Sequence, residues 1–169
     1  MPDYDVVIIG GGFAGLMVAV HLSGLRVAIV HSDRLGVQTS SERAQGGIAA
    51  AVGPGDDPEF HARDTIQAGA GLSDPEVVWN VTTRGPAIIR KLEAYGVRFD
   101  HMGNELKLKH EAAHSCPRVV SAQGANTGAA IMKAMVERVQ ELDIELIEGW
   151  TAHRLLRNSE RVVGVIIEQ

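Results

Sequence analysis

Apolar runs and glycine stops alternate at the start of the chain. Residues 5–9, DVVII, form a short β-branched run that ends at Gly10, and the stretch FAGLMVAVHLSG that follows contains helix formers up to Gly24. The next apolar run, LRVAIV at residues 25–30, predicts a second strand. Strand, glycine turn, helix and strand together predict a βαβ unit with a right-handed crossover and two parallel strands.

Three further helices are expected from the same combination of apolar spacing and terminal signals. They span residues 58–68, 75 to about 95, and about 126–142. In the second, Asp74 is the expected N-cap, a proline follows at the first helical position, and Gly96 is the stop. In the third, Ile131, Met135 and Val139 recur at i+4 spacing, which predicts a buried stripe.

Shorter apolar runs predict strands in the second half of the chain. The run NELKLK at 104–109 alternates polar and apolar residues, which is the period of a half-exposed strand and not of a helix. The other expected strands are VRF at 97–99, IELI at 144–147, and a final hairpin of TAHRLL at 151–156 and VVGVII at 162–167.

Composition places the chain in an ordinary class. Its 169 residues, formal net charge of −5 and 45% hydrophobic fraction fit one soluble α/β domain with a sizeable core. Charges are scattered and aromatic residues make up 4% of the chain, so a nucleic-acid surface is not expected. The single cysteine, Cys116, excludes an internal disulfide, and neither a bilayer-spanning run nor an export signal is present. These features predict a cytoplasmic protein without a membrane partner.

The pentapeptide HEAAH at residues 110–114 matches the sequence pattern of a zinc-peptidase motif. That motif requires a helix, because a helix places two histidines four residues apart on one face with the glutamate beside the metal. Here the preceding LKLK is strand-like and Pro117 follows closely, so no helix is expected. We therefore predict no metal, and from these residues alone the pentapeptide is interpreted as a solvated loop.

The segment GGGFAG at residues 10–15 carries a dinucleotide-binding fingerprint. Gly10, Gly12 and Gly15 supply the tight turn, the close approach to a pyrophosphate and the close helix–strand packing. The helix that starts here favours negative charge at its N-terminus. The acidic residue usually expected after the second strand, where it binds a ribose, is missing, and Ser32 or Asp33 is the candidate to replace it. This motif alone leaves FAD and NAD both open.

A second cluster, TSSERAQGGIAAAV at residues 39–52, combines hydroxyl side chains with two glycines and small apolar residues. Hydroxyls suit phosphate oxygens, and Gly46 and Gly47 allow main-chain N–H groups to approach a flat ring. A glycine-rich surface loop is the alternative. Together with the first fingerprint, this cluster favours FAD.

Several longer stretches occur in an order that identifies a family. AQGGIAA, HARDTIQAGAGLSD, LEAYGVRFD and EAAHS follow the N-terminal fingerprint, with TG beyond them. The series resembles the succinate dehydrogenase/fumarate reductase flavoprotein family, and within it the L-aspartate oxidases, over essentially the whole chain. The resemblance implies an α/β, Rossmann-like FAD-binding domain of the glutathione-reductase type, with a parallel sheet, helices and a β-meander. It also implies that residues 1–169 are the N-terminal part of this domain, truncated, with the capping domain and C-terminal segments absent.

The resemblance further implies a noncovalently bound FAD and a set of site residues. Relatives in the respiratory complexes have a flavin-linking histidine where Ser40 stands, so no covalent link is expected. Glu111 matches a glutamate that orients the substrate, and His114 is either a substrate hydrogen-bond donor or a loop residue. The expected FAD contacts are Gly10, Gly11, Gly12, Phe13, Ala14 and Gly15 at the pyrophosphate, Ser32 and Asp33 at the ribose, Ser40, Ser41, Glu42, Arg43, Ala44, Gln45, Gly46 and Gly47 along phosphate, ribityl and flavin, and Thr151 and Ala152 near the adenine.

Departures from the family pattern keep three functions open. Ala112 and Ala113 replace two family glycines, and His110 stands where an arginine is common. The first function is the FAD-binding part of an L-aspartate oxidase, inactive without missing segments. The second is the same part of a soluble fumarate reductase or succinate dehydrogenase-like flavoprotein. For both, the resemblance implies a small dicarboxylate or amino-acid substrate, and a partner chain or C-terminal portion that completes the fold. The third is a non-catalytic dinucleotide-binding module, for which NAD is an alternative ligand to FAD.

Overall fold

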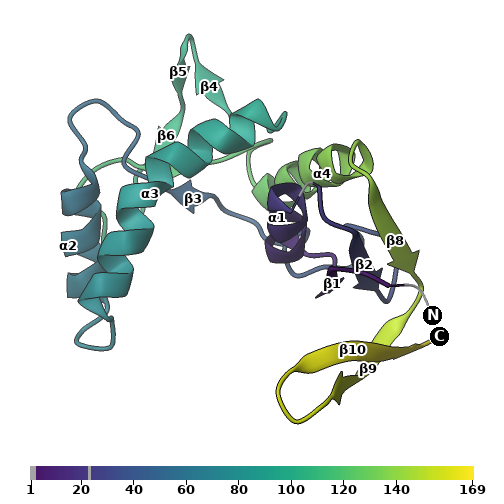
Figure 1. The fold of residues 1–169 in the computed structure, drawn as a ribbon. Coiled ribbons are helices and arrows are strands. Elements are labelled where there is room, and N and C mark those ends of the chain that lie inside the picture. Colours follow the sequence, from purple (N-terminus) through teal and green to yellow (C-terminus); the bar gives the residue numbers. More distant parts are fainter. Residues whose placement is uncertain (1–2, 23) are drawn as a thin grey trace. The chain divides into compact units, whose positions relative to one another are not determined.

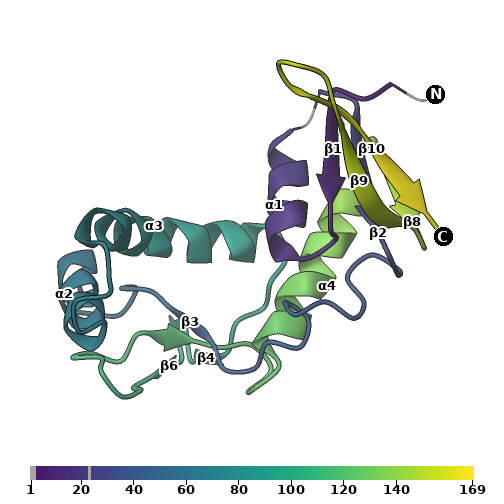
Figure 2. The same cartoon turned by 90° about the horizontal axis from the view of Figure 1, so that it is seen from below.

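The computed structural model describes residues 3–22 and 24–169, and the chain divides into two compact units (Figures 1 and 2). The first unit comprises the residues up to Ala44 together with Ile131–Gln169. The second comprises Gln45–Ala130. Each unit contains a three-stranded sheet of its own.

The first unit is built on a parallel sheet with the strand order β1–β2–β8. These strands are Val6–Ile9, Val27–His31 and Ile144–Glu148. Both neighbours pair with β2 in parallel, and Val27 has Val6 on one side and Ile144 on the other. The central strand is buried along most of its length, because both of its faces are covered, and its sequence is accordingly a continuous apolar run. The predicted parallel βαβ unit is confirmed.

Two helices cover one face of this sheet. α1 spans Phe13–His21, and α4 spans Thr127–Gln140, with most of its length in the first unit. The connections from β1 to β2 and from β2 to β8 step in the same direction, so right-handed crossovers place both helices on the same face, as Figure 1 shows. Ile131, Met135 and Val139 of α4 are buried, as their spacing predicts.

The chain continues from β8 into the predicted antiparallel hairpin. Its strands are β9, Thr151–Arg157, and β10, Val162–Glu168. The side chain of Asn158 accepts hydrogen bonds from two backbone N–H groups of the connecting turn. The N–H of Trp150 donates to the carbonyl of His31, so the start of the hairpin is tied to the end of β2.

Two packed helices, α2 and α3, dominate the second unit (Figure 1). α2 spans Pro58–Ala68 and α3 spans Pro75–Ala94. Each begins with an aspartate N-cap followed by proline: the carboxylates of Asp57 and Asp74 accept hydrogen bonds from N–H groups of the first turn. The predicted cap at Asp74 is thereby confirmed. In the described part of the chain, no helix combines the length and the apolar character that crossing a membrane requires.

Short antiparallel strands complete the second unit. One sheet has the order β3–β7–β6, and a separate pair is formed by β4 and β5. The strands are β3 at Ile48–Ala49, β4 at His101–Met102, β5 at Glu105–Leu106, β6 at Leu108–Lys109 and β7 at Val119–Val120.

Two strand predictions in this unit differ from the structure. Residues 97–99 form no strand, because the N–H of Val97 bonds to the carbonyl of Leu92 at the end of α3 and the apolar side chains simply fill the core. The run at 104–109 is not one strand. It is interrupted at Lys107, whose N–H bonds to the carbonyl of Asp100, so its two halves join different sheets.

Candidate functional site

The glycine turn of the first unit leads from β1 directly into α1. Gly12 is the N-cap residue, its backbone is extended, and it provides no side-chain hydrogen bond to the helix. The helix therefore offers N–H donors to an anion at its N-terminus. The N–H of Phe13, the first helical residue, donates to the hydroxyl of Ser41 at 3.2 Å. The structure thus brings together members of the two predicted clusters.

Two glycines of this turn differ in the space around them. A Cβ at Gly15 would lie 2.2 Å from the carbonyl oxygen of Gly10 and 3.2 Å from Cγ2 of Ile8, so a side chain has no room where the helix packs on the strand. A Cβ at Gly12 would meet only the hydroxyl of Ser41, at 3.4 Å. Gly15 therefore serves the packing of α1 on β1, and Gly12 leaves space beside the helix N-terminus that suits a phosphate group.

His31 is a residue of this region that the sequence analysis did not single out. It is the last residue of β2, its Nδ1 accepts a hydrogen bond from the N–H of Gly11 at 3.3 Å, and its Nε2 lies 3.3 Å from the carbonyl oxygen of Val37. The available signal was its position, since the end of the second strand is where an acidic ribose ligand is usual. The predicted candidates follow it: Ser32 is exposed, and Asp33 accepts from the N–H of its neighbour Arg34.

The segment from Ser40 to Gly47 crosses the boundary between the two units. Its first part forms a turn in which the N–H of Glu42 donates to the hydroxyl of Thr39 at 3.0 Å. In the second unit, a Cβ at Gly47 would lie 2.3 Å from the carbonyl oxygen of Val120, so this glycine is required for packing on β7. The prediction that Gly47 contacts flavin stays a prediction, and the structure supplies a separate reason for a glycine there.

The remaining candidates of the first unit are Thr151 and Ala152, the first two residues of β9. The hydrogen bond from the N–H of Trp150 to the carbonyl oxygen of His31, 3.1 Å long, holds this end of β9 next to the end of β2. The proposed adenine and ribose contacts therefore belong to neighbouring strand ends.

The pentapeptide at 110–114 forms a turn in the second unit, and no helix is present there, as predicted. The N–H of His114 donates to the carbonyl of Glu111 at 3.3 Å, and Nε2 of His110 donates to the carbonyl of His114 at 2.6 Å. Glu111 is exposed and His114 is half-buried. Ala113 has a φ of 69°, in the left-handed region that favours glycine, so this conformation costs about 1 kcal/mol more for the alanine than for a glycine.

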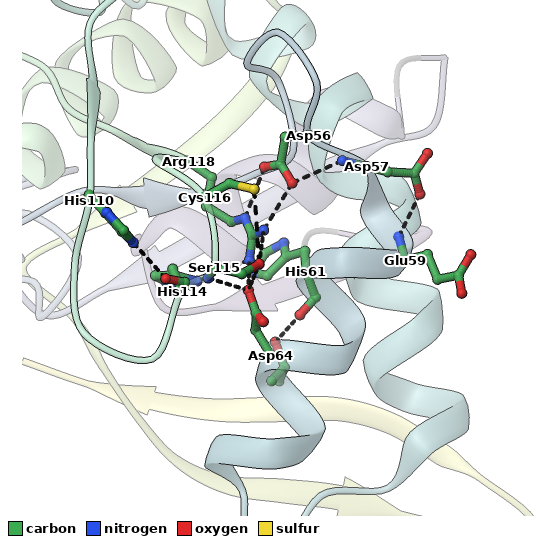
Figure 3. A network of polar contacts seen from close by, with 11 residues as sticks. Asp56, Asp57, Glu59, His61, Asp64, His110, His114, Ser115, Cys116 and Arg118 are labelled. Atoms are coloured by element: carbon green, nitrogen blue, oxygen red, sulfur yellow. Dashed lines mark hydrogen bonds and ion pairs between the residues drawn. The ribbon is translucent and has the colours of Figure 1, made fainter.

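A buried polar network anchors this turn (Figure 3). The guanidinium of Arg118 makes a bidentate contact with Asp56, in which Nε and Nη2 each donate at 2.9 Å. Its Nη1 donates to Asp64 and lies 3.2 Å from Nδ1 of His114. Asp64 also accepts from the N–H and the hydroxyl of Ser115, both at 2.7 Å. The side chains of α2 and of the turn are thus joined through one arginine.

The charges of this network shift the pKa values of its members. Burial raises the pKa of Asp64, but the two hydrogen bonds from Ser115 and the charge and donor of Arg118 outweigh it and lower that pKa from 3.8 to about 2. For Asp56, burial likewise opposes the hydrogen bonds from Arg118, and the net effect is a lowered pKa. Burial and the neighbouring guanidinium lower the pKa of His61. The two carboxylates are therefore ionised and His61 is neutral at neutral pH.

Acid is expected to remove the contribution of Asp64 to stability. Its pKa is depressed in the folded state, so the unfolded chain binds more protons between pH 3.8 and about 2, and the free energy of unfolding falls as the pH drops through that window. Urea unfolding of the wild type and of Asp64→Asn at a series of pH values measures the effect. The difference between them should be largest above pH 4 and vanish near pH 2; a difference independent of pH would contradict the ionised pair.

Comparison with known proteins identifies the domain. Residues 5–169 match the family described as FAD binding domain. The chain is similar to the L-aspartate oxidase of Agrobacterium fabrum, with 42% identity over 98% of this chain and 32% of the relative. It is also similar to the L-aspartate oxidase of Caulobacter vibrioides, with 44% identity over 96% of this chain and 33% of the relative. The chain thus spans about a third of the length of these curated relatives.

Solved structures share the fold. The apo form of the Mycobacterium smegmatis Sdh1 complex matches with a TM-score of 0.87 at 27% identity, over 96% of this chain and 30% of that chain. A variant of the E. coli quinol fumarate reductase FrdA matches with a TM-score of 0.89 at 20% identity, over 97% of this chain and 29% of that chain, a likeness that concerns the fold alone. A parallel strand that turns through glycines into an open helix N-terminus fits a dinucleotide phosphate, and the chain belongs to the FAD binding domain family, with FAD as its cofactor.

Proposed function

We propose that this chain is the FAD-binding portion of an L-aspartate oxidase, which converts L-aspartate to iminoaspartate in NAD biosynthesis. The observation that carries the proposal is 42% identity to such an oxidase over 98% of the chain. Bound FAD would accept a hydride from the substrate α-carbon, and the protein would supply binding, orientation and charge.

The residues of the first unit suit a noncovalent FAD. The N–H groups at the start of α1 and the open space at Gly12 accommodate the pyrophosphate, with the Ser41 hydroxyl beside them. Ser40 has no ring nitrogen to form a covalent bond with flavin. We assign the ribose region to the end of β2. There Nδ1 of His31 accepts a hydrogen bond from the glycine turn, and Ser32 and Asp33 follow in the chain.

The turn at 110–114 is the candidate substrate loop. The Glu111 carboxylate is exposed and suits the amino group of an amino-acid substrate, while His114 provides an imidazole. The carboxylates of the substrate require cations, and we assign these to segments outside the 169 residues, such as a capping domain, because the chain spans only about a third of its relatives.

Two other functions have specific support. Structural likeness to the Sdh1 complex at 27% identity favours the FAD-binding part of a succinate dehydrogenase or fumarate reductase-like flavoprotein. Ala112 and Ala113, which replace two family glycines in the candidate substrate loop, favour a module that binds a dinucleotide without catalysis, because their methyl groups take up space beside the ring and the substrate.

An absorption spectrum of the purified protein tests the cofactor assignment. We expect a yellow protein with flavin bands. We also expect acid precipitation to leave the flavin in the supernatant, because Ser40 cannot link it covalently. Free FAD carried through the same desalting step is the control. Flavin retained in the pellet would contradict noncovalent binding, and a colourless protein that takes up no added FAD would contradict the proposed function as a whole.

A further inference from the structure

The guanidinium group of Arg118 is buried, and its hydrogen bonds fix its orientation. Its side chain has 0% of its surface exposed, and the partner carboxylate of Asp56 has 1% exposed. Because Asp56 takes two parallel donors of the planar guanidinium, the plane and direction of the group are fixed. Nη1 is then directed at Asp64 and His114 and has little freedom to turn away.

The contact between Arg118 and His114 determines which ring nitrogen carries the proton. An arginine side chain has only donors, so Nδ1 of His114 must accept at 3.2 Å and carries no hydrogen. In the neutral imidazole the proton therefore resides on Nε2. A ring with its proton on Nδ1 would instead place two N–H groups against each other.

The surroundings keep the ring of His114 in place. The ring of His61 lies edge-on to it, with the centroids 5.6 Å apart at an interplanar angle of 65°. The carbonyl of His114 accepts from Nε2 of His110, which fixes the backbone of the turn. His61 is neutral and contributes no competing charge. Figure 3 shows the side chains of Arg118, His61 and His114 close to one another.

His114 also borders a cavity. The cavity has a volume of about 500 Å³ and is lined by Asp64, Gln67, Ala68, Ala113, His114 and Ser115. Asp64 cannot donate into this cavity, because its ionised carboxylate only accepts, and one of its oxygens already accepts from Ser115 and Arg118. Of the side chains that line the cavity, the imidazole of His114 and the amide of Gln67 can donate a hydrogen bond, and the imidazole is the one that the Arg118 network fixes.

We propose that Arg118, clamped by Asp56 and Asp64, is a positioning residue that holds His114 in a single tautomer with its proton on Nε2, ready to donate to a carboxylate of the substrate. The inference rests on the proposed function for the identity of the acceptor. The tautomer itself follows from the geometry of the described residues and is tested separately.

The test is the tautomeric state of His114 in the 169-residue protein, measured by nitrogen-15 and carbon-13 NMR at about pH 8, where unperturbed imidazoles are neutral. We expect a preference of roughly tenfold or more for the proton on Nε2, as a charge-assisted hydrogen bond supports. His101 is the internal control, since its Nδ1 lies 2.9 Å from the carbonyl of Phe99 and should carry the proton. A His114 with its proton on Nδ1, or with mixed tautomers, overturns the proposal.

The role of Arg118 is tested with a charge-conserving variant. In Arg118→Lys the ammonium cannot engage two carboxylates and an imidazole in one plane, so the tautomeric preference of His114 should fall toward the unbiased ratio of a free imidazole. Arg63→Lys is the matched control, because Arg63 lies on the same α2 helix as Asp64 and its side chain is 66% exposed. An unchanged preference in Arg118→Lys shows that Arg118 does not set the tautomer and overturns its assigned role.

These results do not depend on cofactor binding. If the protein fails to take up FAD but His114 has the expected tautomer, the proposed function fails and the positioning network stands. If FAD binds and His114 has mixed tautomers, the network inference alone fails. The wild-type measurement keeps the test valid even where Arg118→Lys does not fold.

Discussion

A Gly12→Asp variant is expected to lose FAD binding while the apoprotein keeps its fold. Gly12 has φ −79° and ψ 176°, which any L-residue adopts without strain. A Cβ at this position meets only the Ser41 hydroxyl at 3.4 Å, which is ordinary contact. The backbone and the space around it therefore accept the aspartate, in contrast to Gly15, where a Cβ would lie 2.2 Å from the carbonyl oxygen of Gly10.

The loss of binding has an electrostatic cause. Aspartate is a favoured N-cap residue, and its carboxylate would accept the N–H groups of the first turn of α1 that we propose for the pyrophosphate. It also places a negative charge against two phosphates. We expect the affinity for FAD to fall by about 100-fold or more. The free energy of unfolding of the apoprotein should rise by up to about 1 kcal/mol, since α1 gains a cap.

Gly12→Ala is the matched control for this variant. It adds the same Cβ without the charge, so it should keep most of the affinity for FAD. Titration of flavin fluorescence measures binding, and thermal unfolding without FAD measures stability. Equal affinities of the aspartate and alanine variants would show that the pyrophosphate does not lie at this helix N-terminus.

The parts of the fold that the sequence predicts are those in which local signals agree. At α3, an aspartate cap, a following proline and a glycine stop all indicate the same helix, and the structure has it. The β1–α1–β2 unit was predictable for the same reason, because the apolar runs end at glycines. At residues 97–99 an apolar run without a supporting signal was misleading: it looks like a strand, but its side chains are apolar because they fill the core.

The candidate site was less predictable because it depends on contacts between residues far apart in the chain. Arg118 and Asp56 are 62 positions apart, and no local pattern marks them as partners. His31 is similar, since its contact with Gly11 arises from the parallel pairing of β1 and β2 and not from a motif. The packing reason for a glycine at position 47 is likewise not visible in a local pattern, since it depends on the neighbouring strand β7.

Arg118→Met is expected to lower the free energy of unfolding by about 3–5 kcal/mol. Methionine fills a similar volume but offers no donors, so the carboxylates of Asp56 and Asp64 lose their cationic partner in a site where 1% and 12% of their side chains are exposed. The cost arises mainly from these uncompensated charges and not from the loss of the ion pairs themselves. Urea unfolding near pH 7 measures it.

A surface arginine serves as the comparison for the loss of stability expected in Arg118→Met. Arg26 also pairs with an aspartate, Asp5, but the two side chains are 61% and 40% exposed, and water screens them. Arg26→Met should therefore change the free energy of unfolding far less than Arg118→Met does. If the two variants lose similar amounts, the Arg118 network is no more than a solvated ion pair. If Arg118→Met is restored by adding Asp56→Asn and Asp64→Asn, the buried charges are the cause, because removing them removes the need for the arginine.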